Sequence, residues 1–116
     1  MAETFNNASV KLTTTSATDI YQAPTGNAAD RAIVLSCLVA NVDGTNACDV
    51  TVDVHSAASG GGTAYSLVST ASVAADSSLV VLDKNTAIYL EEDRSITATA
   101  GTASDLEVIV SYEEIS

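Results

Sequence analysis

The side chains best suited to acid–base or nucleophilic chemistry are few and widely spaced. His55 is the only histidine among the 116 residues, and Cys37 and Cys48 are the only cysteines. A serine or cysteine nucleophile needs a base such as histidine within hydrogen-bond reach. Serines and aspartates are numerous enough for a Ser-His-Asp arrangement, but no Gly-x-Ser-x-Gly turn is present to display a nucleophile. We therefore expect His55 to be an ordinary surface residue and the chain to have no catalytic residues.

Candidate ligands for metals and phosphates are equally sparse. Two cysteines and one histidine cannot complete a four-ligand zinc site without carboxylates. The acidic run Glu91-Glu92-Asp93 and the aspartates within residues 43–53 lack the spacing of a calcium-binding EF-hand loop. Gly60-Gly61-Gly62 could cradle a phosphate only if a helix followed, whereas a strand-like segment follows and a flexible loop is expected. We expect no metal, no cofactor and no enzymatic activity.

The two cysteines lie on either side of Asp43-Gly44, a strong signal for a tight hairpin. Such a hairpin would pair residues 31–41 with residues 48–55 and bring Cys37 near Cys48. Cys48 alternates in phase with valines, which favours a small core residue over a ligand. Free thiols are expected in a cytoplasm, and a disulfide stays open as an alternative under oxidising conditions.

Charge excludes several classes of partner. Fifteen acidic residues face four scattered basic ones, which gives a net charge of −11. Nucleic acids and anionic membranes require clustered Lys and Arg, so we expect neither as a partner. No apolar stretch reaches the length of about 18 residues that a membrane span needs. The first residues lack the basic start and apolar core of a signal peptide, so we expect synthesis in a cytoplasm.

The elements that would position these residues are strands. Alternation with period two dominates, and turn signals recur roughly every 8–12 residues, as is typical of sandwiches and jelly rolls. We predict an all-β, single-domain antiparallel β-sandwich, jelly-roll or Ig-like, with about eight short strands over residues 10–116. The expected strands lie near residues 10–13, 20–21, 31–41, 48–55, 65–68, 79–82, 87–90, 95–100 and 105–112.

Residues 1–9 precede the first expected strand and are predicted to form an N-terminal arm. Phe5 is the only phenylalanine and is followed by Asn6 and Asn7. An aromatic side chain on a polar arm often marks a contact that is buried against a partner. We therefore name Phe5, Asn6 and Asn7 as candidate interaction residues. The alternative is that Phe5 caps the core of its own domain.

Several stretches resemble small virion structural proteins of marine tailed phages, especially phages of cyanobacteria. The resemblance runs over most of the chain from about Leu12 onward, in residues 14–21 with Pro24, 32–41, 49–54, 77–84, 88–93 and 106–114. In size and acidity these proteins are similar to capsid decoration (cement) proteins, which sit on the outer face of the head and hold it against internal pressure.

The resemblance implies a capsid decoration protein that is made in the host cytoplasm and binds the virion surface. Its partners would be the major capsid protein or other virion proteins and further copies of itself, with a trimer among the arrangements. One alternative is a protein of the neck, tail or fibre. Another is a carbohydrate-binding or adhesive module, which the lack of Trp and the placement of all four tyrosines on or near apolar strand faces argue against.

Overall fold

The computed structural model describes residues 3–24 and 31–115. In this part of the chain there are nine strands and one short 3₁₀ turn. The strands are β1 (Glu3–Leu12), β2 (Thr18–Gln22), β3 (Arg31–Asn41), β4 (Cys48–His55), β5 (Ala64–Val73), β6 (Ser78–Leu82), β7 (Ile88–Glu91), β8 (Ser95–Ala100) and β9 (Leu106–Ile115), and the turn is η1 (Ala58–Gly60). No helix in the described ranges has the length and hydrophobicity needed to cross a bilayer.

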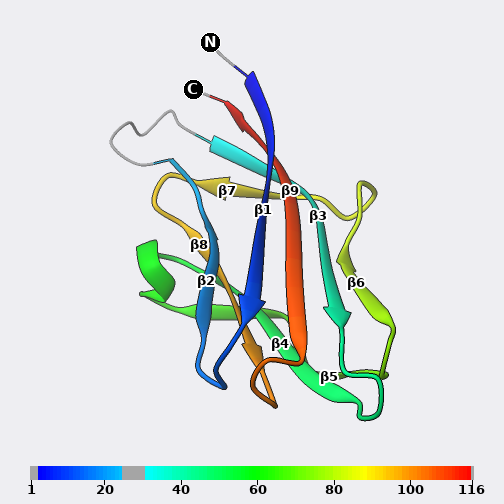
Figure 1. Cartoon of the computed structure of the whole chain (residues 1–116). Coiled ribbons are helices and arrows are strands. Elements are labelled where there is room, and N and C mark those ends of the chain that lie inside the picture. Colours follow the sequence, from blue (N-terminus) through cyan, green and yellow to red (C-terminus); the bar gives the residue numbers. More distant parts are fainter. Residues whose placement is uncertain (1–2, 25–30, 116) are drawn as a thin grey trace.

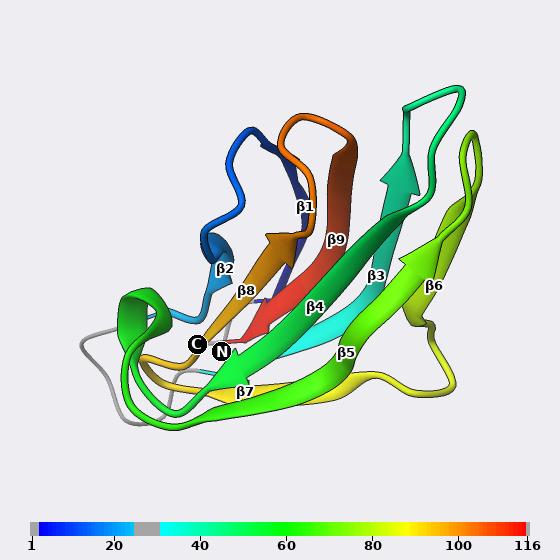
Figure 2. The ribbon, with the colours of Figure 1, turned by 90° about the horizontal axis from the view of Figure 1, so that it is seen from below.

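The strands form two antiparallel sheets packed face to face (Figures 1 and 2). The first sheet has the order β1-β9-β3-β6, and β7 pairs with the other end of β3. The second has the order β2-β8-β4-β5. The predicted all-β sandwich is confirmed. Most consecutive strands cross from one sheet to the other, so the jelly-roll alternative describes the connectivity better than the Ig-like one.

The core lies between the sheets because each strand turns one apolar face inward. On β4, Cys48, Val50 and Val52 are buried while Asp49 is exposed, as their alternation predicts. The inward face of β9 is likewise apolar. The buried apolar set is Leu12, Ile20, Tyr21, Ala23, Ala32, Val34, Cys37, Val39, Cys48, Val50, Val52, Val73, Leu82, Leu90, Ile96, Ala98, Ala100, Leu106, Val108 and Val110.

The first strand begins at Glu3 rather than at Val10. Its ten residues pair with β9 from Glu3↔Ile115 to Leu12↔Leu106 without a register shift. The segment expected to form an arm is therefore mostly strand, apart from residues 1–2, which lie outside the described ranges. Asn6 and Asn7 have low strand propensity, but hydrogen bonding to the adjacent β9 overrides a local preference of this size.

The predicted hairpin at Asp43-Gly44 is wrong. β3 and β4 lie in different sheets, so this turn is a corner between sheets. Buried Asn41 stabilises the corner: its Nδ2 donates to the carbonyls of Val73 (2.9 Å) and Asn46 (3.0 Å), and its Oδ1 accepts from the Asp43 N–H (2.9 Å). Cys37 and Cys48 consequently belong to opposite sheets, and both are buried free thiols.

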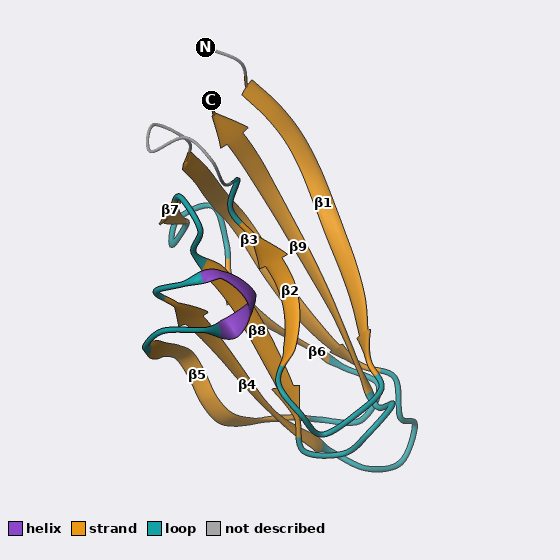
Figure 3. Cartoon of the chain, turned by 90° about the vertical axis from the view of Figure 1, so that its left-hand side faces the viewer, coloured by secondary structure: helices purple, strands orange, loops and turns teal. Residues whose placement is uncertain are grey.

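The molecule is elongated, with principal dimensions of 47 × 26 × 20 Å. β1, β9 and β3 extend beyond the second sheet at one end, where the start of β1 pairs with the end of β9 (Figure 3). The far ends of β1 and β9 therefore present a face that is backed by little of the opposite sheet.

Candidate interaction site

The outward-facing surface of the β1-β9-β3-β6/β7 sheet, called here the outer face, carries most of the exposed large apolar side chains. Four of them project from it: Tyr89 is 76% exposed, Phe5 67%, Val80 59% and Ile109 41%. Their strand neighbours Leu90, Leu82 and Val110 point inward and are buried. A patch of this kind on an otherwise polar protein commonly marks an interaction surface.

Strand register arranges the outer face in rows that run across the sheet. One row is Tyr89–Ile33–Glu113–Phe5. A second is Val80–Leu38–Ile109–Ser9. Between them lies the row Ser36–Ser111–Asn7, whose side chains are small or polar. Two mainly apolar ridges therefore flank a lower, polar strip.

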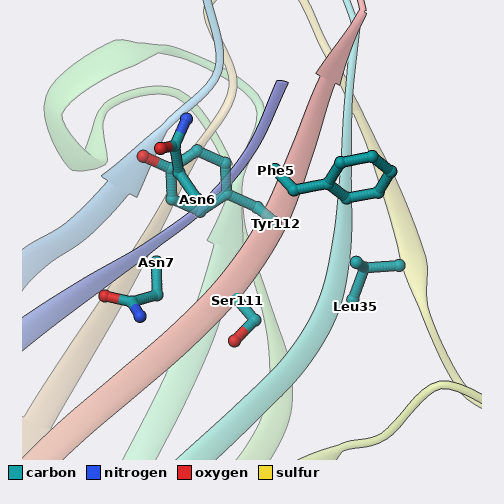
Figure 4. A pocket seen from close by; sticks show the side chains of 6 residues that line it. All are labelled: Phe5, Asn6, Asn7, Leu35, Ser111 and Tyr112. Carbon is teal, nitrogen blue, oxygen red and sulfur yellow. The ribbon is translucent and has the colours of Figure 1, made fainter. Parts of the chain in front are cut away.

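A shallow, open pocket of about 520 Å³ lies at this strip. It is lined by Phe5, Asn6, Asn7, Leu35, Ser111 and Tyr112 (Figure 4). Leu35 sits at the register shift between Val34 and Ser36 on β3, and in Figure 4 its side chain lies on the same side as the Phe5 ring. The pocket has the dimensions to receive one or two side chains of a partner.

The three residues named from the sequence all line this pocket. Phe5 is largely exposed, so it does not cap the domain core. Phe5 and Asn7 share the outer face, whereas Asn6 is opposite Tyr112 on the inward-pointing side. Sequence reasoning missed the other contributors, Leu35, Ser111 and Tyr112, because strand pairing brings them to the pocket from β3 and β9.

An aromatic and hydrogen-bonded cluster supports the inward side of the site. The rings of Tyr21 and Tyr112 have centroids 4.0 Å apart and are inclined by 30°. The Tyr21 hydroxyl donates to Glu114 Oε2 at 2.5 Å. Burial raises the pKa of Tyr21, and the hydrogen bond and negative charge of Glu114 raise it further. These contacts join β2 to β9 and fix the end of β9 that lines the pocket.

Glu113 lies within the first row of the outer face, and further charged groups lie near the other end of β1 and β9. Lys11 and Glu107 pair at 3.7 Å on exposed side chains, and they are cross-strand neighbours. Asp43 and Asp105 lie close together near the start of β9. Backbone N–H groups of Thr45 and Asn46 lower the pKa of Asp43, whereas partial desolvation and the Asp43 charge raise the pKa of Asp105.

His55 is buried, contrary to the surface position expected for it. It does lie on the outward side of its sheet, but η1 and its flanking loop cover it. Its Nε2 lies 2.8 Å from Thr97 Oγ1, and its Nδ1 has no hydrogen-bond partner among the described residues. Ser95 Oγ, on the strand beside it, accepts from the Gly60 N–H and donates to the Ala57 carbonyl. The glycine-rich loop expected to be flexible is thus tied to β8.

Two of the four tyrosines also differ from expectation. Tyr21 is buried and Tyr112 is half-buried. Tyr65 and Tyr89, in contrast, are largely exposed, at 62% and 76%. Tyr65 belongs to β5 of the second sheet, so the two exposed rings lie on different sheets. Across residues 3–24 and 31–115, no three His, Cys, Asp or Glu side chains are grouped to bind a metal ion.

Comparisons with known proteins bear on the fold. No protein-family profile and no curated protein sequence matches the chain. A solved structure of Bacillus endospore appendages, described as a family of disulfide-linked pili, has a TM-score of 0.57 and 17% identity, covering 99% of this chain and 87% of the other. A structure of infectious bursal disease virus Gt strain has a TM-score of 0.45 and 9% identity, covering 97% of this chain and 32% of the other. At 17% identity the first likeness shows the fold alone: the chain is a β-sandwich similar in fold to the protein in the appendage structure.

Proposed function

We propose that this chain is a structural protein that attaches to a larger particle through its outer face, and specifically that it decorates the head of a tailed phage. The observation that carries the proposal is the gathering of Phe5, Tyr89, Val80 and Ile109 on one face around a shallow pocket. The sequence resemblance to phage virion proteins is the reason for proposing a phage head as the particle.

The dimensions of the outer face suit such a contact. A stable interface buries about 800 Å² on each partner. The two longest dimensions of the molecule, 47 and 26 Å, leave room for a contact of that size. Apolar ridges would supply the buried centre of the contact, and the Lys11–Glu107 pair would remain at its rim, where exposed ion pairs contribute about 0–1 kcal/mol.

The remaining surface suits a protein that stays dispersed until it docks. A net charge of −11 makes most surfaces of separate copies repel one another and so opposes aggregation in solution. In this proposal the partner is the major capsid protein or another virion protein, and the location is the particle surface.

Binding to undecorated heads tests the role. We expect the wild-type protein to sediment with heads at micromolar concentration. Phe5→Ala should weaken this binding by at least tenfold, because the ring stands at one wall of the pocket. Tyr65→Ala, which removes a ring of similar exposure from the second sheet, should bind as the wild type does. No binding by the wild type, or equal loss in both variants, would exclude attachment through this face.

Copy number distinguishes head decoration from a place in the neck, tail or fibre. Quantitative mass spectrometry of purified virions would give this chain's abundance relative to the major capsid protein. A ratio near one, or a fixed fraction such as one third, is expected for decoration. A handful of copies per particle would instead assign the protein to the neck or tail.

A carbohydrate-binding role is the second candidate, and the exposure of Tyr89 favours it. Sugar rings commonly stack on the face of an exposed aromatic side chain. The outer face places Tyr89 beside Ile33 and in one row with Phe5. A glycan array probed with the wild type and with Tyr89→Ala tests this role: a signal that the variant loses would support it, and an array without signal would reject it.

A further inference from the structure

The four sides of the sandwich differ in how well their edge strands are protected. The second sheet ends in β2, which has five residues and a bulge, and in β5, which has two register shifts. Within β5, Thr70 has a φ of +52°, which interrupts the regular strand. Its N–H donates to the side-chain Oγ1 of Thr51. The far side of the first sheet ends in two short strands, β6 and β7. Short and bulged edges resist pairing with another chain.

β1 has none of these protections. It is ten residues long, pairs with β9 alone, and keeps one register throughout. Figure 3 shows it at the margin of its sheet, with β9 on one side. It contains no proline, and Lys11, near its end, is its only basic residue. A long regular edge of this kind is a template for a further strand.

We propose that β1 pairs antiparallel with β1 of a second copy, about a twofold axis at Asn7. This arrangement places Asn7 opposite Asn7, Phe5 opposite Ser9, and Glu3 opposite Lys11, each across the two copies. The inference concerns the edge of the sheet and does not depend on the docking role of the outer face.

Two features favour this register: the alternation of side chains between the two faces of the sheet, and the positions of the charged residues in β1. The two outer faces become continuous only if odd-numbered residues of β1 oppose odd-numbered residues of the other copy, because successive side chains alternate faces. Centring on Asn7 uses residues 3–11 of both strands and places the single acidic residue in the sequence of β1 in register with its single basic one. A centre at Ala8 would instead place Phe5 opposite Lys11, and Glu3 opposite Thr13, which lies beyond the strand.

Charge within the strand does not oppose pairing at β1, just as it would not at the uncharged edge strands β5 and β6. The chain as a whole carries −11, so most pairs of surfaces are both acidic. Within β1, Glu3 and Lys11 balance, and the residues between them are uncharged. A twofold dimer formed here joins two five-stranded sheets into one and doubles the outer face. Two linked faces bind a repeating surface more tightly than one.

Engineered cysteines test the pairing and its register. Directly opposed residues in an antiparallel pair have Cα atoms about 4.5–5.5 Å apart, within disulfide range, whereas diagonal neighbours are about 7–8 Å apart. Asn7→Cys should therefore form a disulfide dimer on mild oxidation. Phe5→Cys and Ser9→Cys should each form no disulfide dimer when oxidised alone, and should crosslink when the two variants are mixed. Cys37 and Cys48 are buried and should not contribute.

Asn85→Cys, at an exposed position between β6 and β7, controls for random collision. Sedimentation equilibrium of the wild type should show a reversible monomer–dimer equilibrium. A strictly monomeric wild type at millimolar concentration would overturn the pairing. Crosslinking of Phe5→Cys or Ser9→Cys alone, or equal yields for Asn7→Cys and Asn85→Cys, would overturn the register. Phe5→Ala should lose head binding but keep the wild-type dimerisation, which separates this inference from the docking role.

Discussion

Tyr21 and Asn41 are single side chains that each link one sheet to the other. Tyr21 on β2 donates to Glu114 on β9, and Asn41 on β3 donates to the Val73 carbonyl at the end of β5. Both are buried, so the hydrogen bonds form where competing water is scarce. Loss of a partner from a buried hydrogen bond leaves an unsatisfied group, which costs more than the bond itself contributes.

Tyr21→Phe should lower the free energy of unfolding by about 1–2 kcal/mol at neutral pH, because it removes the hydroxyl donor to a half-exposed carboxylate. The pKa of Tyr21 is raised above its ordinary value of 10.0, so its contribution is complete below pH 10 and declines as pH rises further. The difference in the free energy of unfolding between the wild type and Tyr21→Phe should therefore shrink above pH 10. Urea unfolding at a series of pH values measures it.

Burial raises the pKa of Cys37 from 9.0 to about 11, which also destabilises the fold as pH rises above 9. This contribution is present in the wild type and in Tyr21→Phe alike, so it cancels in their difference. A difference that stays constant or grows above pH 10 would contradict the assigned hydrogen bond.

Asn41→Ala should cost about 2–3 kcal/mol of stability, because it leaves the Val73 carbonyl and the Asp43 N–H without their partner at a buried corner. Asn85→Ala is the matched control at an exposed turn and should stay within about 0.5 kcal/mol of the wild type. Denaturant midpoints of the two variants give the comparison. Similar midpoints for both would show that the corner does not depend on Asn41.

At the scale of elements, the connection between β4 and β5 is a fixed loop that covers His55. The Ser56 N–H bonds to the Thr63 carbonyl (3.0 Å), and the Thr63 N–H bonds to Ser56 Oγ (2.8 Å). Gly62 has a φ of +66°, and a Cβ placed there would lie 2.3 Å from Ser56 Oγ. Only glycine satisfies both the backbone angle and the space at this position.

Gly62→Ala should therefore destabilise the protein by about 2 kcal/mol, from left-handed backbone strain and displacement of Ser56. Gly44→Ala is the contrasting variant. Gly44 does not have a positive φ, and a Cβ added there would lie 3.5 Å from Asp76 Oδ2, an ordinary van der Waals distance. It should shift the thermal midpoint by no more than a degree or two. The reverse order of the two midpoints would refute this account of the loop.

At the scale of the whole molecule, charge opposes compactness. Fifteen acidic residues and four basic ones share a chain of 116 residues. Folding brings the acidic groups closer together than they are in the unfolded chain, and the resulting repulsion lowers stability. The exposed Lys11–Glu107 ion pair contributes at most about 1 kcal/mol to stability.

Added salt should therefore raise the thermal midpoint. At about 0.15 M ionic strength the Debye length falls to about 8 Å, which screens most repulsion between exposed carboxylates. The increase should be largest at low salt and level off near that concentration. Scanning calorimetry in sodium chloride would measure it, and a midpoint that falls with salt would show that attractive pairs dominate.

Part of the candidate site could be read directly from the chain. Phe5, Asn6 and Asn7 attract attention as an aromatic residue with two amides in a polar segment. Leu35 and Ser111 carry no such signal, because each is one of many similar residues in its strand. They reach the pocket through the pairing of β3 with β9, and a register shift at Leu35 sets its position.

Alternation and composition by themselves determined the strands, the single acidic domain and the inward faces of β4 and β9, because a period of two is a local property of the backbone. The tertiary structure alone decided which strands pair. Asp43-Gly44 became a corner rather than a hairpin, and residues 3–9 became an edge strand rather than an arm. His55 became buried because the loop that directly follows it in the chain folds back and is held to Ser95 on β8. Pairing depends on how apolar faces from the whole chain are buried together, and no local window of sequence contains that information.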